Sequence, residues 1–471
     1  MKICIIAEGS YPYVSGGVSS WINSLMTSMP DKEFVIYAIA ADQSYKGKYK
    51  YTFPANLVEI HEVFLDTHLR ETSNWARRYN LTSEEKINLL ALINGNAKVN
   101  WEELFKLLKS DRFENVSEFL ASKDYFDLIS ELAKTDYAEV PFTSLYWTVS
   151  SMILPLFLIV REDIPEADVY HTVSTGYAGV VGALAKALKK KPVILTEHGI
   201  YSREREEEII KADWVIGYFK DLWINYFYTL SSAIYDLSDE VITLFNKNKE
   251  IEVDLGCPPD KIRIIPNGIE VNDYTNAIRT YQDSKIRIGA IVRVVPIKDI
   301  KMMIQAFAIV VEQMPEAELY ILGPYEENLS YYEECLNLVN SLNVKNVVFT
   351  GLVNISTYIG NLDILLLTSI SEGQPLAILE GFACKKPFIA TNVGSCRELI
   401  EGLNDEFGPA GFIVPVMHYE EMANRILYLA KNPNLMKTMG ENGFKRVKAY
   451  YQKDKVISDY RSIYDTIGGK K

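Results

Sequence analysis

The feature that most constrains the fold is a strand-then-helix rhythm that runs twice along the chain. Short, continuously apolar runs alternate with segments of helical spacing. Strands without polar alternation are covered on both faces, which requires a parallel sheet flanked by helices. The runs of the first series are KICIIA (2–7), FVIYAIA (34–40), DVYHT (168–172), PVILTEHG (192–199), EVITLF (240–245) and KIRIIPNG (261–268). The first half therefore predicts a parallel α/β sheet.

A second series follows a polar, aperiodic stretch at 269–285, which is the candidate linker. Its strands are predicted at 286–292, 317–323, 346–350, 363–368 and 387–391. Because 471 residues exceed one ordinary core, two domains are expected. We predict two Rossmann-like, doubly wound α/β domains facing a central cleft. Their expected bounds are 1–275 and 285–445, with a C-terminal helix at 446–471 that packs back on the first domain.

Between 70 and 160 the rhythm stops, and segments such as SEEKINLLALIN carry helical periodicity with few β-branched residues. We predict a helical insertion in the first domain. Its most apolar run, 145–160, is short for a bilayer span, contains Pro155 and ends in three charged residues. A buried helix is therefore expected there.

Composition limits the class of protein. Hydrophobic residues at 48% and charged residues at 24% are typical of a soluble globular chain. A formal net charge of -13 argues against a nucleic-acid partner, because phosphate backbones favour clustered Lys and Arg. The five cysteines include no C-x-x-C pair, and the N-terminus reads as a strand and loop instead of a secretory signal. A cytoplasmic location is predicted.

Two cations follow the first strand of the second series. Arg293 and Lys298, in IVRVVPIKD, come directly after strand 286–292. Ligands of open α/β sheets lie beyond the carboxyl ends of strands, and arginine binds phosphate oxygens in bidentate fashion. The pair can bracket a diphosphate; a pair of solvated surface charges is the alternative.

The stretch SEGQPLAILEGFA at 371–383 forms a second candidate site. Pro375 suits the first position of a helix, and the free amides and dipole of that first turn attract anions. The residues of this anion site are Gly373, Gln374, Pro375 and Leu376.

Two carboxylates flank that anion site. Glu372 precedes it, and Glu380 lies about 8 Å further along the helix axis from Pro375. Carboxylates beside a phosphate would repel it unless they accept hydrogen bonds from sugar hydroxyls. A nucleotide sugar fits, since it has a ribose on one side of its diphosphate and a hexose on the other.

The first domain offers two further candidates. Gly16 and Gly17 follow strand 2–7, where adjacent glycines permit close approach of a phosphate or sugar; a plain turn is the alternative. Glu197 and His198 end the strand at 192–196, a suitable place for a functional histidine. No D-x-D motif occurs, so neither a metal nor another cofactor is expected, and Arg293 with Lys298 would neutralise the leaving diphosphate.

With these motifs in hand, the chain resembles the retaining glycosyltransferases of family 4, which have the GT-B fold. The motifs that carry the resemblance are the E-x7-E pair Glu372 and Glu380, the cations Arg293 and Lys298, IIPNGIE (264–270), NVGSCREL (392–399) and Gly16-Gly17. The stretches YPYVSGGVSSWI and LTEHGIYSREREEEI, with the insertion, are more narrowly similar to the PelF-type enzymes of Pel exopolysaccharide synthesis.

The resemblance implies roles for the second domain, which would bind the donor. Glu380 would bind the ribose hydroxyls, and Glu372 the hexose near its reacting carbon. Arg293 and Lys298 would hold the diphosphate. NVGSCREL departs from the more usual double glycine with proline, which leaves the roles of Ser395 and Glu398 undefined.

The first domain would bind the acceptor. The resemblance places His198 by the donor sugar and Gly17 near the phosphates once the cleft closes. It implies front-face transfer with retention from a UDP-sugar, with UDP-glucose favoured and an N-acetylhexosamine donor open. It also implies an integral-membrane transport partner at the inner face of the membrane and a polysaccharide acceptor.

Three alternatives stay open at this point. One is a nucleotide-sugar epimerase or a phosphorolytic enzyme on the same fold. Another is a non-catalytic, nucleotide-binding scaffold subunit of a membrane polysaccharide complex, which the insertion favours. A glycoside hydrolase built on Glu372 and Glu380 is the third, but its carboxyl pair would face one bond, and Arg293 and Lys298 would have no purpose.

Overall fold

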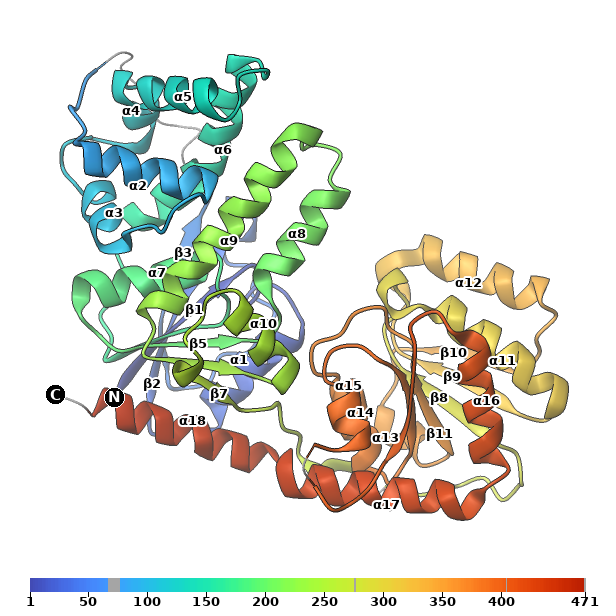
Figure 1. Cartoon of the computed structure of the whole chain (residues 1–471). Coiled ribbons are helices and arrows are strands. Elements are labelled where there is room, and N and C mark those ends of the chain that lie inside the picture. Colours follow the sequence, from blue (N-terminus) through green and yellow to red (C-terminus); the bar gives the residue numbers. More distant parts are fainter. Residues whose placement is uncertain (67–76, 275–276, 404, 470–471) are drawn as a thin grey trace. The chain divides into compact units, whose positions relative to one another are not determined.

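The computed structural model describes residues 1–66, 77–274, 277–403 and 405–469. The chain divides into two compact units, each with one parallel sheet (Figure 1). The first unit comprises Met1–Thr243, Asn248–Ile264 and Tyr460–Lys471, and the second comprises Leu244–Lys247 and Ile265–Asp459. Each unit has its own hydrophobic core. The predicted fold class, two doubly wound α/β domains, is confirmed.

The sheet of the first unit has seven parallel strands in the order β3-β2-β1-β4-β5-β6-β7. The strands are β1 (Lys2–Glu8), β2 (Glu33–Ala40), β3 (Leu57–Phe64), β4 (Val169–Thr172), β5 (Val193–Glu197), β6 (Glu240–Thr243) and β7 (Ile262–Ile264). The strand order reverses between β1 and β4, which is where doubly wound sheets hold their ligands. The sequence did not predict β3, because polar residues such as Glu59 and Glu62 interrupt the continuous apolar run that marked the other strands.

Helices cover this sheet and build the insertion. Around the sheet lie α1 (Gly17–Thr27), α7 (Tyr177–Leu184), α8 (Tyr201–Lys211), α9 (Lys220–Leu237), α10 (Asn246–Asp254) and the end of α18 (Lys453–Gly468). The insertion contains α2 (Ser83–Asn94), α3 (Trp101–Leu108), α4 (Val116–Leu120), α5 (Lys123–Thr135) and α6 (Phe142–Arg161), drawn in blue to teal in Figure 1. Side chains of Thr82, Asn100, Asn115 and Ser122 cap four of these helices. The helical prediction is confirmed over 83–161, and residues 70–76 lie outside the described residues.

Helix α6 carries the apolar run that the sequence singled out. By length and composition it is the one described helix that qualifies as a candidate membrane span. Half of its apolar window is buried inside the structure, and two of its hydroxyl groups contact neighbouring helices. Tyr146 donates to the carbonyl of Leu120 at 2.6 Å, and Ser150 Oγ lies 2.9 Å from the hydroxyl of Tyr125. Helix α6 therefore packs as the core helix of the insertion, as predicted.

The second unit repeats the topology with six parallel strands in the order β10-β9-β8-β11-β12-β13. The strands are β8 (Arg287–Ile291), β9 (Glu318–Leu322), β10 (Val347–Gly351), β11 (Ile364–Leu367), β12 (Phe388–Thr391) and β13 (Gly411–Val414), and the short edge strand β13 was not predicted. The helices are α11 (Ile300–Gln313), α12 (Leu329–Ser341), α13 (Ile355–Ile359), α14 (Leu376–Ala383), α15 (Cys396–Glu401), α16 (Tyr419–Ala430), α17 (Pro433–Tyr450) and the start of α18. Here the strand order reverses between β8 and β11.

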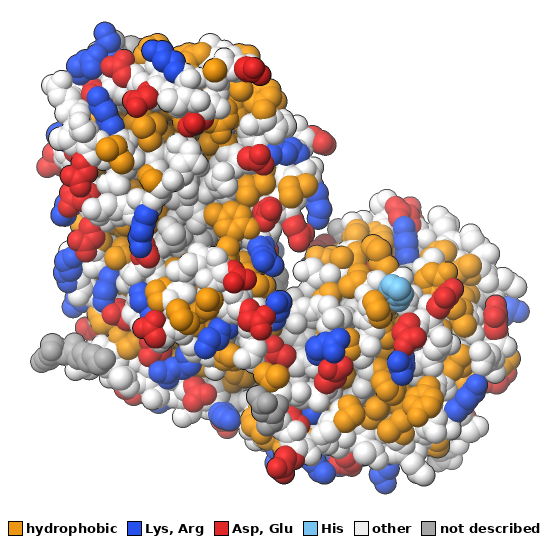
Figure 2. All heavy atoms as spheres, viewed as in Figure 1, with side chains coloured by type: hydrophobic (Ala, Val, Ile, Leu, Met, Phe, Trp, Pro, Cys, Tyr) orange, Lys and Arg blue, Asp and Glu red, His pale blue; other side chains and the backbone are white. Residues whose placement is uncertain are grey.

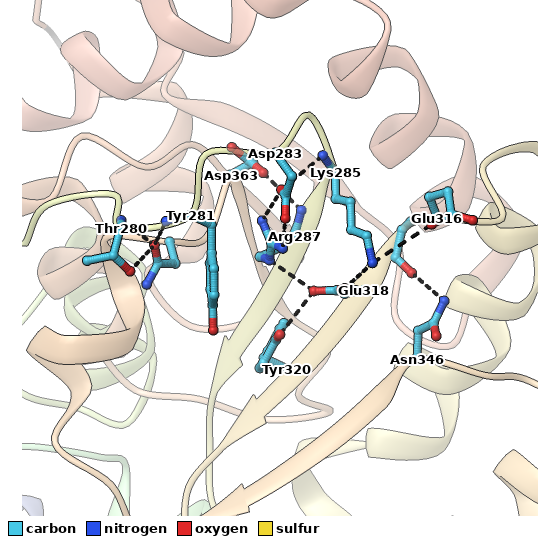
Figure 3. Close-up of polar contacts among 12 residues, drawn as sticks. Thr280, Tyr281, Asp283, Lys285, Arg287, Glu316, Glu318, Tyr320, Asn346 and Asp363 are labelled. Carbon is cyan, nitrogen blue, oxygen red and sulfur yellow. Dashed lines mark hydrogen bonds and ion pairs between the residues drawn. The ribbon is translucent and has the colours of Figure 1, made fainter.

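The described parts of the stretch expected to be a linker, 269–274 and 277–285, are fastened to the second unit (Figure 3). Arg287 is 3% exposed and is held by both oxygens of Asp283, at 2.7 and 2.8 Å, and by Glu318 at 2.9 Å. The ring of Tyr281 lies over the same guanidinium, with its centroid 4.1 Å away. This network closes the amino ends of β8 and β9, so it stabilises the edge of the sheet opposite the candidate site.

Charged side chains of both signs are interspersed over the face drawn in Figure 2. On that face, the acidic residues that give the whole chain its formal net charge of -13 are therefore mixed with cations. Recognition of a charged ligand must come from particular side chains, which the loops after the strands supply.

Candidate functional site

The site in the second unit lies at the carboxyl ends of the neighbouring strands β8 and β11. The loop after β8 carries Lys298, and the loop after β11 carries Glu372. Lys298 Nζ lies 2.5 Å from Glu372 Oε1, and the two side chains are 18% and 11% exposed. Two of the predicted site residues, 74 positions apart in the sequence, are thus in contact. A half-buried cation at a topological switch point is suited to binding an anionic ligand.

Backbone and hydroxyl contacts hold these two loops together. Ser369 Oγ donates to Glu372 Oε1 at 2.6 Å, so the carboxylate has a second fixed partner. Thr368 Oγ1 donates to the carbonyl of Lys298 at 2.8 Å, and the amide of Ile370 donates to the carbonyl of Ile297 at 2.9 Å. Because both loops are fixed, the lysine and the carboxylate are preorganised.

The loop after β12 forms a hydrogen bond to the loop that carries Glu372. The amide of Ser395 donates to the carbonyl of Gly373 at 3.0 Å. Gly394 has φ +50°, and a Cβ there would lie 2.2 Å from the carbonyl oxygen of Gly373, so only glycine fits. Ser395 Oγ is buried without a hydrogen-bond partner among the described residues. The unusual NVGS sequence therefore places an unused hydroxyl beside the Glu372 loop.

Helix α14 starts one residue later than the sequence predicted. Pro375 has an extended ψ of 112° and is the N-cap, so Leu376 is the first helical residue. The reason is that proline fixes φ but leaves ψ free, and the extended ψ lets its carbonyl accept from the amide of Ile378 at 3.2 Å. No side chain caps α14, and Gln374 instead accepts a hydrogen bond from the amide of Asn267 at 2.5 Å.

Glu380 lies on α14 and faces a tyrosine from the expected linker. Burial raises the pKa of Glu380, and a hydrogen bond from the hydroxyl of Tyr274 acts in the opposite direction. The pKa of Tyr274 is raised by its own burial and by the carboxylate. Tyr274 was not predicted, since nothing in its polar surroundings marks it as a partner for a residue more than a hundred positions away.

Arg293 lies at the same end of the sheet but is not in contact with Lys298 or Glu372 in any described interaction. Its Nη1 binds both oxygens of Glu327 at 2.7 and 2.8 Å, next to the short helix η8 (Glu326–Asn328) that follows β9. The two side chains are 55% and 52% exposed. Arg293, the second predicted cation, therefore lies at the same end of the sheet as Lys298. It is more exposed than Lys298 and is paired with a different carboxylate, Glu327.

In the first unit, the glycines Gly16 and Gly17 lie between β1 and α1. Gly16 is extended, with φ 179°, and is the N-cap of α1, which no side chain caps. A Cβ built on either glycine would meet no atom within 4 Å. The glycines thus leave open space at the uncapped start of a helix.

His198 follows β5 and packs against Trp21 from α1. The ring centroids are 4.7 Å apart at an interplanar angle of 72°. Burial lowers the pKa of His198 to about 4, so the imidazole is neutral at pH 7. Its Nε2 is buried without a hydrogen-bond partner among the described residues. A neutral ring with one unused nitrogen can donate to or accept from a hydroxyl group.

A second histidine, His171, also contacts Trp21, with ring centroids 5.8 Å apart. His171 Nδ1 is 2.6 Å from the hydroxyl of Tyr464, and its Nε2 is 2.7 Å from Thr196 Oγ1. Tyr460, also from α18, has its ring centroid 5.2 Å from that of Trp21. The sequence did not predict this aromatic cluster, because its members come from positions 21 to 464.

Glu197, the neighbour of His198, points into the interior of the first unit. Its Oε2 accepts from the hydroxyl of Tyr235 at 2.6 Å, and its Oε1 accepts from the amide of Tyr201 at 3.2 Å. Burial raises the pKa of Glu197 and also that of Glu252, which lies close enough to interact with it electrostatically. Of the two adjacent candidates, only His198 lies beside Trp21.

Comparison with known proteins gives a family match for each half of the chain. Residues 1–260 match the family model described as "Domain of unknown function (DUF3492)", and residues 276–446 match "Glycosyl transferases group 1". An N-acetyl-alpha-D-glucosaminyl L-malate synthase of Bacillus anthracis is 30% identical over 170 residues, which is 36% of this chain and 42% of that protein. A UDP-Gal:alpha-D-GlcNAc-diphosphoundecaprenol alpha-1,3-galactosyltransferase of Escherichia coli is 23% identical over 80% of this chain and 95% of its own.

A solved structure covers nearly the whole chain. Anabaena Alr3699/HepE, in complex with UDP and glucose, superposes with a TM-score of 0.59 at 16% identity over 99% of each chain. This likeness shows the fold. The chain thus has the GT-B fold, and its residues 276–446 form a domain of the group 1 glycosyltransferases. Within that class, the chain belongs to the DUF3492 family, whose model covers more than half of it.

Proposed function

We propose that this protein is a retaining, family 4 hexosyltransferase that moves a hexose from a UDP-sugar to a growing exopolysaccharide such as Pel. UDP-glucose is the favoured donor. The observation that carries the proposal is the contact between Lys298 and Glu372 at the switch point of the second unit. A cation and a carboxylate held together there match the two needs of a sugar diphosphate, since its phosphates bind cations and its hydroxyls bind carboxylates.

Donor binding follows from the charges of this site. The diphosphate takes the ammonium of Lys298, helped by the uncapped amides at the start of α14 and by Arg293. Glu372, fixed by Ser369, then accepts from hydroxyls of the hexose. Glu380 accepts from the ribose hydroxyls in place of the hydrogen bond that Tyr274 donates.

Transfer takes place on the face of the sugar from which the phosphate leaves. The acceptor oxygen forms its bond to the anomeric carbon as the bond between that carbon and the phosphate oxygen breaks. The acceptor proton passes to the departing phosphate, and the configuration at the anomeric carbon is retained. Lys298 and Arg293 stabilise the charge that develops on the diphosphate, so the step needs no metal. His198, neutral and with a free Nε2, hydrogen-bonds a sugar hydroxyl.

Two of the similar proteins support the choice of donor. HepE is described in complex with UDP and glucose, and the Escherichia coli relative is named for transfer from UDP-Gal. The Bacillus anthracis relative is named for an N-acetylglucosaminyl product, so a UDP-N-acetylhexosamine is the second candidate. The likeness to PelF-type enzymes supports a cytoplasmic location at the inner face of the membrane, with an integral-membrane transport partner.

Calorimetric titration with UDP-, GDP- and ADP-sugars tests the donor assignment. We expect UDP-glucose to bind most tightly, and to bind equally well with EDTA and with Mg²⁺ or Mn²⁺. Tightest binding of a GDP- or ADP-sugar, or binding that requires a metal, would contradict the proposal. Incubation of the preferred donor alone distinguishes the remaining alternatives. A transferase hydrolyses it slowly, an epimerase converts the sugar, and a scaffold subunit leaves it unchanged even when an acceptor is added.

A further inference from the structure

The outer side of α9 carries an open hollow of about 510 Å³ that the donor site does not use. Three segments line it: the loop 95–99 between α2 and α3, one face of α9, and the turn that follows α10. Its polar lining includes Asn96, Lys98, Asn225, Tyr228, Thr229 and Asp236. The helical insertion forms one wall and the Rossmann-like core of the first unit forms the other.

The two walls are rigid and close together. Gly95 ends α2 with φ +67°, and a Cβ there would lie 3.2 Å from Thr229 Oγ1 and 3.3 Å from Asn225 Cβ. Trp101 Nε1 donates to Ser232 Oγ at 3.3 Å across the same junction. Loop 95–99 is thus fixed against α9, so the hollow is formed before a ligand arrives.

The groups in the hollow suit an uncharged, hydroxylated ligand. Asn96 and Asn225 are exposed, and within the described part of the chain neither side-chain amide has a hydrogen-bond partner. Lys98 Nζ lies 3.0 Å from Asp236 Oδ1, so the cation and the carboxylate neutralise each other. The one lysine and one aspartate of the lining give no net charge that would select an anion, and a lipid would find few apolar groups. Free amides beside tyrosines offer both donors and acceptors to sugar hydroxyls.

A second hollow of about 650 Å³ shares one lining residue, Asp236, with the first. Four of its charged side chains form ion pairs: Lys186 binds both oxygens of Asp239 at 2.6 and 2.8 Å, and Arg263 binds Glu240 at 3.0 Å. Lys261 instead donates to the carbonyls of Tyr235 and Asp236. The hollow lies at the amino ends of β6 and β7, the edge of the sheet opposite the end that carries His198. This second hollow is therefore remote from the end of the sheet that carries His198.

We propose that these adjoining hollows form a binding groove for a neutral oligosaccharide chain. The groove holds a distal part of the polysaccharide acceptor while its end reacts elsewhere, and this role rests on the proposed function. Retention of the chain by the first unit would make the enzyme prefer long acceptors over short ones. The preference arises from binding alone, so it acts on KM and leaves kcat unchanged.

Direct binding tests the groove without any transfer reaction. The full chain is titrated with cellohexaose, maltohexaose and chitohexaose, and with an acidic hyaluronan hexasaccharide. Asn225→Trp and Asn96→Trp fill the hollow from opposite walls, and Glu207→Trp adds the same bulk on the exposed face of α8. We expect at least one neutral hexasaccharide to bind, with affinity reduced about tenfold or more in both groove variants and unchanged in Glu207→Trp.

Three results would overturn the inference: no neutral hexasaccharide binds, both groove variants bind like the wild type, or hyaluronan binds most tightly. UDP titration of the same variants reports on the donor site separately. Normal UDP binding with no oligosaccharide binding removes the groove and leaves the proposed function intact. Oligosaccharide binding that the groove variants weaken, in a protein that binds no nucleotide sugar, removes the proposed function instead.

Discussion

The two units share one strand order but carry different chemistry where the order reverses. In the second unit the loops beyond β8 and β11 bring together Lys298 and Glu372, a charged pair. In the first unit the segments beyond β1 and β5 bring together Trp21 and His198, an aromatic pair in which the imidazole is neutral. Topology sets where a ligand can bind, and the loop residues decide which ligand it is.

The carboxylates of the two units differ in the same way. Glu372 has a cation and a hydroxyl as partners, so its charge is compensated. Glu252 in the first unit is fully buried, and both its oxygens lack a hydrogen-bond partner among the described residues. The surroundings of Glu372 in the second unit therefore favour the ionised carboxylate. Those of Glu252 in the first unit favour the protonated carboxyl group.

The largest effect is expected at the charged pair. Lys298→Ala should lower the rate of hexose transfer about 1,000-fold, because the developing charge on the diphosphate loses its half-buried cation. Initial rates of UDP release measure this. Lys301→Ala is the matched control, since Lys301 forms a surface ion pair with Glu334 on exposed faces of α11 and α12. The assignment fails if the two variants are equally active while both are folded.

A smaller loss is expected at the aromatic site. His198→Ala should lower the transfer rate about 100-fold and leave UDP affinity unchanged, since the proposed UDP site lies in the second unit. His418→Ala, at an exposed position before α16, is the control. Because burial lowers the pKa of His198 to about 4, protonation of this ring should not reduce the rate between pH 6 and 8. Weaker UDP binding in His198→Ala would contradict the proposal that the two units bind different parts of the reaction's substrates.

The free energy of unfolding should depend on pH through the buried carboxyl group of Glu252. Burial raises the pKa of Glu252, so the folded state binds the proton more tightly than the unfolded state. The free energy of unfolding therefore falls as pH rises above the ordinary glutamate pKa of about 4.3. Glu252→Gln cannot ionise and should be about 2 kcal/mol more stable than the wild type at pH 8, with little difference at pH 4.

Urea unfolding at several pH values measures this difference. Glu250→Gln, exposed on the same helix, should follow the wild-type curve. A Glu252→Gln protein that is less stable than the wild type at pH 8 would show that the carboxylate is ionised and held by partners.

The smallest effect is expected at Arg293. Its pair with Glu327 is more than half exposed, so its loss should cost no more than about 1 kcal/mol of stability. Arg293→Ala should nevertheless weaken UDP binding about tenfold, the contribution of one phosphate contact. Glu327→Ala should bind UDP at least as tightly as the wild type, because it releases the guanidinium. Equal UDP affinity in the wild type, Arg293→Ala and Glu327→Ala would show that Arg293 does not contact UDP.

The sequence predicted the buried strands well, because an apolar run with helices on both sides has one stable arrangement. It did not predict β3 or β13, which lie at sheet edges. In the site, residues next to strand ends were predicted, among them Lys298, Glu372 and His198. Partners from distant segments were not: Tyr274 came from the expected linker, and Trp21 has no local signal that pairs it with a histidine.

The division of the chain between the units has a practical consequence for anyone who dissects this protein. The last turns of α18 return to the first unit, where Tyr464 meets His171 and Tyr460 meets Thr196. An N-terminal fragment that stops near residue 275 lacks Tyr464, so Nδ1 of His171 loses its hydrogen-bond partner. Biochemists who want the first unit alone should graft residues 453–469 onto it, or supply them as a separate peptide.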